Sequence, residues 1–152
     1  MNFMKWFFIS LLIASSSSIC SAQIQIGSGT STQSFAPINS YFGYNYSQQV
    51  YYASEIGQSG TISSISFFLA SGNGTNSTSW TIYLGHTTLN TFSTTTGWIT
   101  SSNLSEAFNG TVVFPSSGNW MTVNLTTPFV YNGTDNLIVA IDENTPGFTS
   151  SS

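Results

Sequence analysis

The chain has 152 residues, and only 4% of them are charged: one Lys or Arg against five Asp or Glu, with a single His and a single Cys. This balance excludes nucleic acids and anionic membrane surfaces as partners, because affinity for phosphate groups comes from Lys and Arg side chains. Aromatic residues make up 15% of the chain, whereas disordered segments are poor in them.

The N-terminus has the pattern of a secretory signal peptide over residues 1–22. Lys5 precedes an apolar stretch, Trp6–Ala14, and small residues follow it as far as Ala22, after which we expect cleavage. The apolar stretch falls well short of the roughly 20 residues that span a bilayer as a helix. We therefore expect a secreted or cell-surface protein with no membrane insertion after cleavage.

Cleavage at this point would leave a mature chain, residues 23–152, that has the length of one domain. The mature chain has five acidic residues, no Lys or Arg and no Cys, so neither ion pairs nor disulfides can stabilise it. A small exported domain without disulfides favours a bacterial source. Lipidation of Cys20 is an alternative to simple cleavage, although Ile19 stands where a lipobox has a small residue.

The first half of the mature chain contains four expected strands. Residues 23–40 begin as a short alternating strand, QIQI, and continue as a Gly/Ser/Thr loop, and QQVYYA at 48–53 is the next expected strand. In 61–70, Ile65, Phe67 and Leu69 alternate on one face, and 80–84 has a strict period of two, so both segments are predicted strands, the second of them half-buried. We expect Gly85 to end the second of these.

The second half begins with a long connection, 87–110, whose only mild helical potential lies at 102–108. A short strand is expected at 111–115, where Pro115 stops it, and an alternating strand at 119–125. The last strand, 137–142, is apolar on both faces, which is typical of a central strand covered on both sides.

These segments predict an all-β fold, an antiparallel β-sandwich, over residues 41–144. A central strand at 137–142 needs a neighbour on each edge, but nothing after Asn144 has a strand pattern. Either an earlier strand flanks it, or the chain is the front of a longer protein and the tail, 145–152, is truncated. We expect the second.

The ordered motifs GTISSISFFL, WTIYLGHTTLNTF and NWMTVNLTTPFVYNGTDNLIVAIDEN resemble a module of secreted and surface proteins of Bacteroidota. Such proteins often carry fibronectin type III repeats and a C-terminal sorting domain for type IX secretion. The resemblance covers most of residues 27–144 and implies a jelly-roll or galactose-binding-like sandwich. It implies no catalytic residues, and we expect no sorting domain within residues 1–152.

The single histidine, His86, follows the glycine that is expected to end a strand. Nucleophilic catalysis would need a base, a nucleophile and an orienting carboxylate within reach of one another, and no nucleophile-elbow motif is present. We expect His86 to bond loop backbone at the strand end.

Acidic residues cluster in sequence around the last strand, with Asp135 before it and Asp142 and Glu143 at its end. A structural Ca²⁺ takes six to eight oxygen ligands and would relieve the repulsion among such acids, so these three are candidate calcium ligands. The alternative is that they simply face water. No other cofactor is expected.

Aromatic side chains are the better candidates for ligand binding. Trp98 lies in the long connection, and Tyr83 and Trp120 point away from the aliphatic faces of their strands. Exposed rings of this kind stack on sugars, although they could instead cover the second face of a sheet.

We therefore expect a non-catalytic exported module that acts in cell-surface adhesion or as a structural or interaction domain, with glycans or surface proteins as partners. The alternative is a carbohydrate-binding module, and more remotely a fragment of a secreted hydrolase. The sequence does not indicate an oligomeric state.

Overall fold

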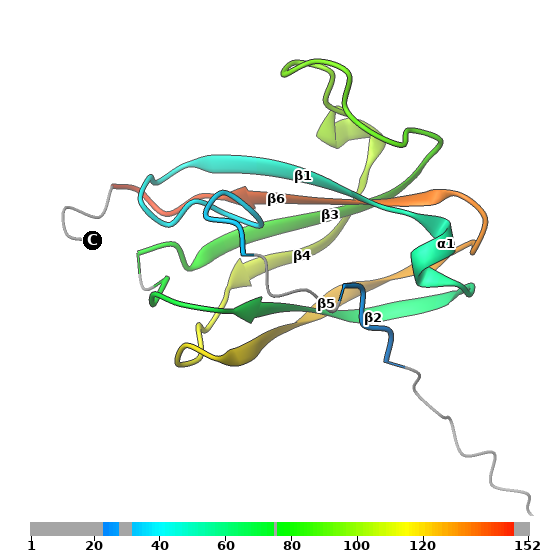
Figure 1. The fold of residues 1–152 in the computed structure, drawn as a ribbon. Coiled ribbons are helices and arrows are strands. Elements are labelled where there is room, and N and C mark those ends of the chain that lie inside the picture. Colours follow the sequence, from blue (N-terminus) through cyan, green and yellow to red (C-terminus); the bar gives the residue numbers. More distant parts are fainter. Residues whose placement is uncertain (1–22, 28–31, 75, 148–152) are drawn as a thin grey trace, which may run out of the picture.

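The computed structural model of the chain describes residues 23–27, 32–74 and 76–147 (Figure 1). The predicted signal peptide and residues 148–152 therefore lie outside the described residues. Two sheets and two short helical turns make up the described fold. Its elements are β1 (Asn45–Tyr51), α1 (Ala53–Ile56), β2 (Gly60–Leu69), β3 (Ser79–Thr87), η1 (Ser101–Asn103), β4 (Ser105–Thr111), β5 (Asn119–Tyr131) and β6 (Asn136–Glu143).

The predicted all-β antiparallel sandwich is confirmed. Strand pairs are nested in sequence, because β1 pairs with β6, β2 with β5 and β3 with β4, all antiparallel. A further pair, β3 with β6, closes a four-stranded sheet in the order β1-β6-β3-β4, which faces a two-stranded sheet of β2 and β5 (Figure 1). Nested pairs are what results when one long hairpin is wrapped across two layers, as in a jelly roll.

The last strand, β6, is central as predicted. Its neighbours are the earlier strands β1 and β3, one on each edge, and Leu137–Ile141 are buried. The expectation that a neighbour comes from beyond residue 144 is therefore wrong, and the alternative, that earlier strands flank β6, is confirmed. Nesting carries the first strand back to the last one, a long-range pairing that local patterns do not indicate.

The core lies between the two sheets. Trp80, Ile82 and Leu84 of β3 are at most 1% exposed, and they face Met121 and Val123 of β5, each 4% exposed. This is the alternation that the sequence predicts for these strands. The indole nitrogen of Trp80 donates to the backbone oxygen of Ser77 at 2.6 Å, so the buried indole keeps a hydrogen-bond partner.

Several predicted boundaries are wrong. Residues 23–27 form no strand, because four alternating residues cannot form one without a pairing edge. The segment at 102–108 is not helical beyond η1, and the predicted strand at 111–115 is irregular after Thr111. Pairing with β3 instead makes Ser105–Thr111 a strand, so tertiary context overrides local propensity.

The second half of β5 and the helix α1 were not predicted. β5 continues past residue 125 to Tyr131, and Pro128 sits in the irregularity between the pairs Ser64–Asn124 and Ile62–Phe129, where no ladder bond needs its missing N–H. The four-residue helix α1 ends at Ile56, and its C-cap residue Gly57 has a left-handed φ of 73° that suits glycine.

Candidate functional site

The outward face of the four-stranded sheet carries a group of aromatic and acidic side chains. In the strand register, Tyr46 lies opposite Asp142, and Tyr83 lies opposite both Ala140 and Glu106. Because side chains alternate along a strand, these residues project away from the buried Ile82 and Ile141. We call the group formed by Tyr46, Tyr83, Trp98, Glu106 and Asp142 the outer site.

Trp98 reaches the outer site from the long connection between β3 and η1, which stands above the sheet in Figure 1. The side-chain amide of Gln48 fixes this connection. Its oxygen accepts from the backbone N–H of Ile99 at 3.0 Å, and its nitrogen donates to the backbone oxygen of Ile99 at 2.5 Å and to the Tyr46 hydroxyl at 2.9 Å.

The Trp98 ring consequently lies over the ring of Tyr46. Their centroids are 5.1 Å apart with a tilt of 32°, within the range of favourable aromatic pairs. Even so, Trp98 is 43% exposed. A large ring is thus held in place while part of its surface remains open to a ligand.

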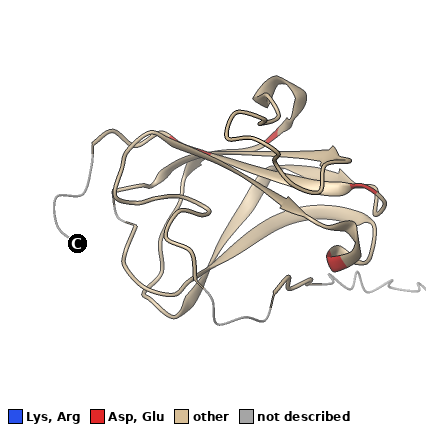
Figure 2. Ribbon diagram, turned by 45° about the horizontal axis from the view of Figure 1, so that its top comes forward, with Lys and Arg blue, Asp and Glu red and all other residues tan. Residues whose placement is uncertain are grey.

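The electrostatics of the outer site are negative. The pKa of the Tyr83 phenol is raised, chiefly by desolvation and further by the carboxylates of Glu106 and Asp142 and by Tyr46. The described residues contain no Lys or Arg, and Figure 2 accordingly shows acidic positions on the ribbon without any basic one. Nothing in this part of the chain neutralises the two carboxylates.

Trp120 does not join the outer site. It lies on β5 opposite Phe68 of β2, on the outward face of the two-stranded sheet, with ring centroids 5.4 Å apart. The two rings are 47% and 52% exposed. Of the three aromatic residues predicted from the sequence, the structure therefore brings Trp98 and Tyr83 to one face and places Trp120 on the opposite side of the sandwich.

The three predicted calcium ligands do not come together. Asp135 precedes β6 and accepts from the side-chain amide of Asn132 at 2.7 Å, whereas Asp142 and Glu143 lie at the far end of this eight-residue strand, roughly 20 Å away at about 3.3 Å per residue. As strand neighbours, Asp142 and Glu143 point to opposite faces. The predicted shared site is thus wrong, and the described residues hold no group of three His, Cys, Asp or Glu suited to a metal ion.

Glu143 has a structural environment instead. Its side chain is 0% exposed. One carboxylate oxygen accepts from the backbone N–H of Thr145 at 2.7 Å and the other from the side-chain amide of Asn45 at 3.3 Å. Beside it, Gly43 donates to the backbone oxygen of Gly147 at 2.6 Å, so this buried acid fastens the loop before β1 to the chain after β6.

His86 has the structural role expected from the sequence, although Gly85 does not end the strand and His86 lies within β3. Its Nε2 accepts from the backbone N–H of Asn132 at 3.0 Å. The ring stacks on Tyr131 at a centroid distance of 5.7 Å and lies 4.9 Å from the ring of Phe129. These contacts tie β3 to the end of β5.

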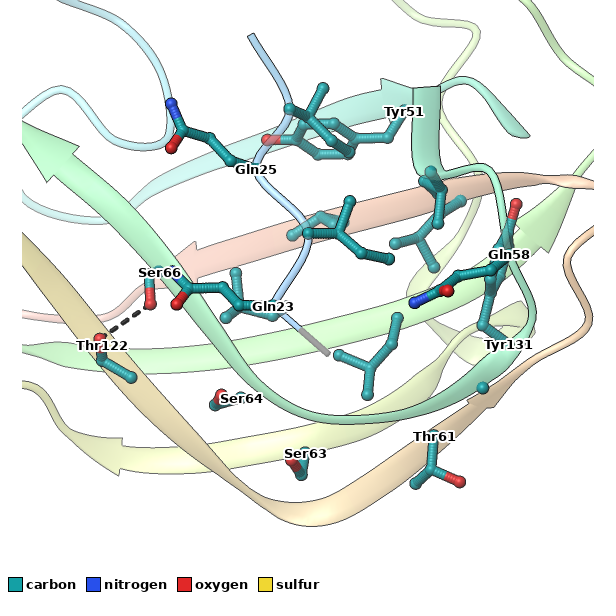
Figure 3. Close-up of a pocket in the computed structure, with 18 of the residues that line it drawn as sticks. Gln23, Gln25, Tyr51, Gln58, Thr61, Ser63, Ser64, Ser66, Thr122 and Tyr131 are labelled. Carbon is teal, nitrogen blue, oxygen red and sulfur yellow. Dashed lines mark hydrogen bonds between the residues drawn. The ribbon is translucent and has the colours of Figure 1, made fainter. Parts of the chain in front are cut away.

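A cavity of about 510 Å³ opens where the edges of β1 and β2 face each other, and the segment Gln23–Ile26 lies across it (Figure 3). Its floor is formed by core residues such as Val139 and Leu137. The described residues that line it include no Asp, Glu or His, so this cavity offers no acid–base pair for catalysis.

Comparison with models of known families, with curated proteins and with solved structures finds no match to the chain. Within the described residues, no helix has the length and apolar character that crossing a membrane requires.

Sequence reasoning missed two members of the outer site, Tyr46 and Glu106. The alternation of Asn45–Tyr51 places Tyr46 and Gln48 on one face and could have indicated the first. No local signal indicates Glu106, because its place depends on the pairing of β4 with β3.

Proposed function

We propose that the chain is a non-catalytic, exported β-sandwich module that acts in cell-surface adhesion by binding a glycan at the outer site. The signal-peptide pattern of residues 1–22 and the resemblance to surface modules of Bacteroidota support export. The separation of Asp135 from Asp142 and Glu143, and the structural role of His86, favour binding over hydrolysis.

The observation that carries the proposal is the position of Trp98. Its ring is 43% exposed, yet it is held on Tyr46 through the hydrogen bonds between Gln48 and Ile99. A ring already fixed loses little freedom when a ligand binds. The C–H face of a pyranose ring packs well on an aromatic face, whose negative quadrupole attracts the C–H groups.

Tyr83 and the two carboxylates would supply the polar part of such a site. Sugar recognition combines an apolar stacking surface with a few polar groups that fix orientation. The outer site has both kinds of group on one sheet face, whereas no acid lies among the residues that line the cavity beside Trp120.

A glycan array followed by titration calorimetry tests the proposal with a matched pair of variants. Trp98→Ala and Trp120→Ala each remove one half-exposed tryptophan, from opposite sides of the sandwich. We expect Trp98→Ala to weaken binding about tenfold or more, since a stacked aromatic contributes about 1 kcal/mol beyond its buried area, and Trp120→Ala to leave it unchanged.

Loss of binding in Trp120→Ala but not in Trp98→Ala would move the adhesive surface to the two-stranded sheet and reject the outer site. Failure of the unmodified protein to bind any glycan on the array would reject glycan binding altogether.

A further inference from the structure

We infer that the outer site selects glycans that carry a free amino group, in preference to neutral or N-acetylated glycans built on the same sugar ring. This inference rests on the proposed function, because it specifies the ligand of the same site.

The five acids differ in whether their carboxylates accept hydrogen bonds from the described residues. Three of them already accept hydrogen bonds. Asp135 accepts from Asn132, Glu143 accepts from Thr145 and Asn45, and Glu55 accepts from the backbone N–H of Tyr52 at 3.2 Å. The carboxylates of Glu106 and Asp142 accept none from the described residues. The two acids of the outer site are therefore the two whose acceptor oxygens remain available.

Glu106 and Asp142 belong to the two strands that flank the strand of Tyr83. Glu106 approaches from β4 on one side, and Asp142 belongs to β6 on the other. Tyr46 from β1 and Tyr83 from β3 are the other titratable groups on this face. All four are neutral or negative at neutral pH, and no described cation offsets them. Two carboxylates thus flank an aromatic ring from neighbouring strands.

A ligand that carries a primary ammonium group matches two carboxylates that flank an aromatic ring. A primary ammonium has three donors and no acceptor, and its hydrogen bonds to a carboxylate are about twice as strong as those of a neutral hydroxyl. Aromatic faces such as those of Trp98 and Tyr46 also attract cations. A sugar ring bearing an ammonium group combines this charge with a flat C–H face for stacking, whereas N-acetylation removes the charge.

A lysine-rich peptide would bring the same charge, but it lacks the rigid ring. Fixing a long lysine side chain costs rotamer entropy, which a sugar ring does not lose. The half-exposed Trp98 ring favours the sugar, and the peptide serves as a comparison ligand in the test.

The experiment compares an oligomer of glucosamine with an oligomer of N-acetylglucosamine of equal length, by calorimetry on the full chain at low and at physiological ionic strength. We expect the glucosamine oligomer to bind at least about tenfold more tightly, because hydrogen bonds to charged groups contribute more than about 1.4 kcal/mol, the equivalent of tenfold. Salt should reduce this preference, since exposed charges are screened.

The double variant Glu106→Gln with Asp142→Asn should bring the ratio of the two affinities to about one, because neither oligomer then meets a carboxylate at the outer site. Glu55→Gln is the matched control. It removes one negative charge far from the outer site, and Gln keeps the capping-box chemistry, so the preference should persist.

Equal binding of the two oligomers by the unmodified protein would overturn the inference and leave the proposed function standing. Absence of binding for both, together with no effect of Trp98→Ala on any glycan, would overturn the proposed function itself. A lysine-rich peptide of equal charge that competes as well as the glucosamine oligomer would show recognition of charge alone and would also overturn the inference.

Discussion

The two sheets of the sandwich differ in how well they protect the residues that they contribute to the core. In the four-stranded sheet, β3 and β6 each have neighbours on both edges, and Ile82, Leu84 and Ile141 are 0% exposed. In the two-stranded sheet the inward residues of β5, such as Val123 at 4% exposure, are also buried, but Ile65 and Phe67 of β2 remain partly exposed. The poorly protected part of the core therefore lies along β2.

The cavity sharpens this comparison, because it lies along the edge of β2 and is lined by Ile62, Ile65 and Phe67. Side chains that border open space have fewer contacts to lose, and their surroundings can relax when they are shortened. Substitutions of equal size should thus have unequal costs in the two sheets.

The largest expected difference is between Ile141→Ala and Ile65→Ala. Ile141 is fully buried, so we expect its truncation to lower the free energy of unfolding by about 2–5 kcal/mol. The cost for Ile65 should be no more than about half of that loss, because the penalty for a truncated side chain depends on how far its site can collapse. Urea unfolding with an unchanged m-value measures both, and equal losses would contradict the contrast between the sheets.

A smaller loss of unfolding free energy is expected when the buried Glu143 is replaced. Glu143→Ala would leave the N–H of Thr145 and the amide of Asn45 without their acceptors, at a cost of about 1–3 kcal/mol in unfolding free energy. Asp142→Asn, one residue away on the outer face, should stay within about 0.5 kcal/mol of the unmodified protein. If the two variants were equally stable, Glu143 would have no fastening role.

The smallest expected effect is a loss of stability at alkaline pH. Burial raises the pKa of Tyr51 and of Tyr131, and Glu55 and Asp135 respectively raise them further. A tyrosine whose pKa is higher in the folded state contributes stability that is complete below the unfolded value of about 10 and is lost as the pH rises through the folded value. We expect the unfolding free energy to fall above about pH 10, by at most about 1.4 kcal/mol per pH unit for each tyrosine.

Chemical denaturation at a series of pH values checks this expectation. Tyr51→Phe, at the edge of the four-stranded sheet, should flatten the alkaline decline. A decline of unchanged slope in Tyr51→Phe would show that this tyrosine does not contribute to it.

The sequence predicts best those strands whose two faces differ clearly or are both apolar. β2, β3 and β6 are located to within a few residues, because alternation or continuous hydrophobicity is visible without the partner strand. β4 is not located by the sequence, because SEAFNGT has no face that is consistently apolar or polar. The segment becomes a strand only by pairing with β3. The run beyond Pro128 is missed because proline ordinarily ends strands.

The candidate site could be predicted only in part for the same reason. The exposed ring of Trp98 and the outward direction of Tyr83 follow from local pattern. Their meeting with Tyr46, and the flanking of Tyr83 by Glu106 and Asp142, depend on a register that joins four strands. The predicted grouping of Asp135 with Asp142 and Glu143 was wrong because an extended strand of eight residues holds its two ends far apart.

The central place of β6 has a consequence for how the protein comes into being. The contact between Asn45 and Glu143 joins residues 98 positions apart, and contacts this distant form slowly. A nascent chain that ends before β6 has β1 without a partner and β3 without one of its two, so the larger layer cannot assemble. The four-stranded sheet can therefore form only after Asn136–Glu143 has been synthesised.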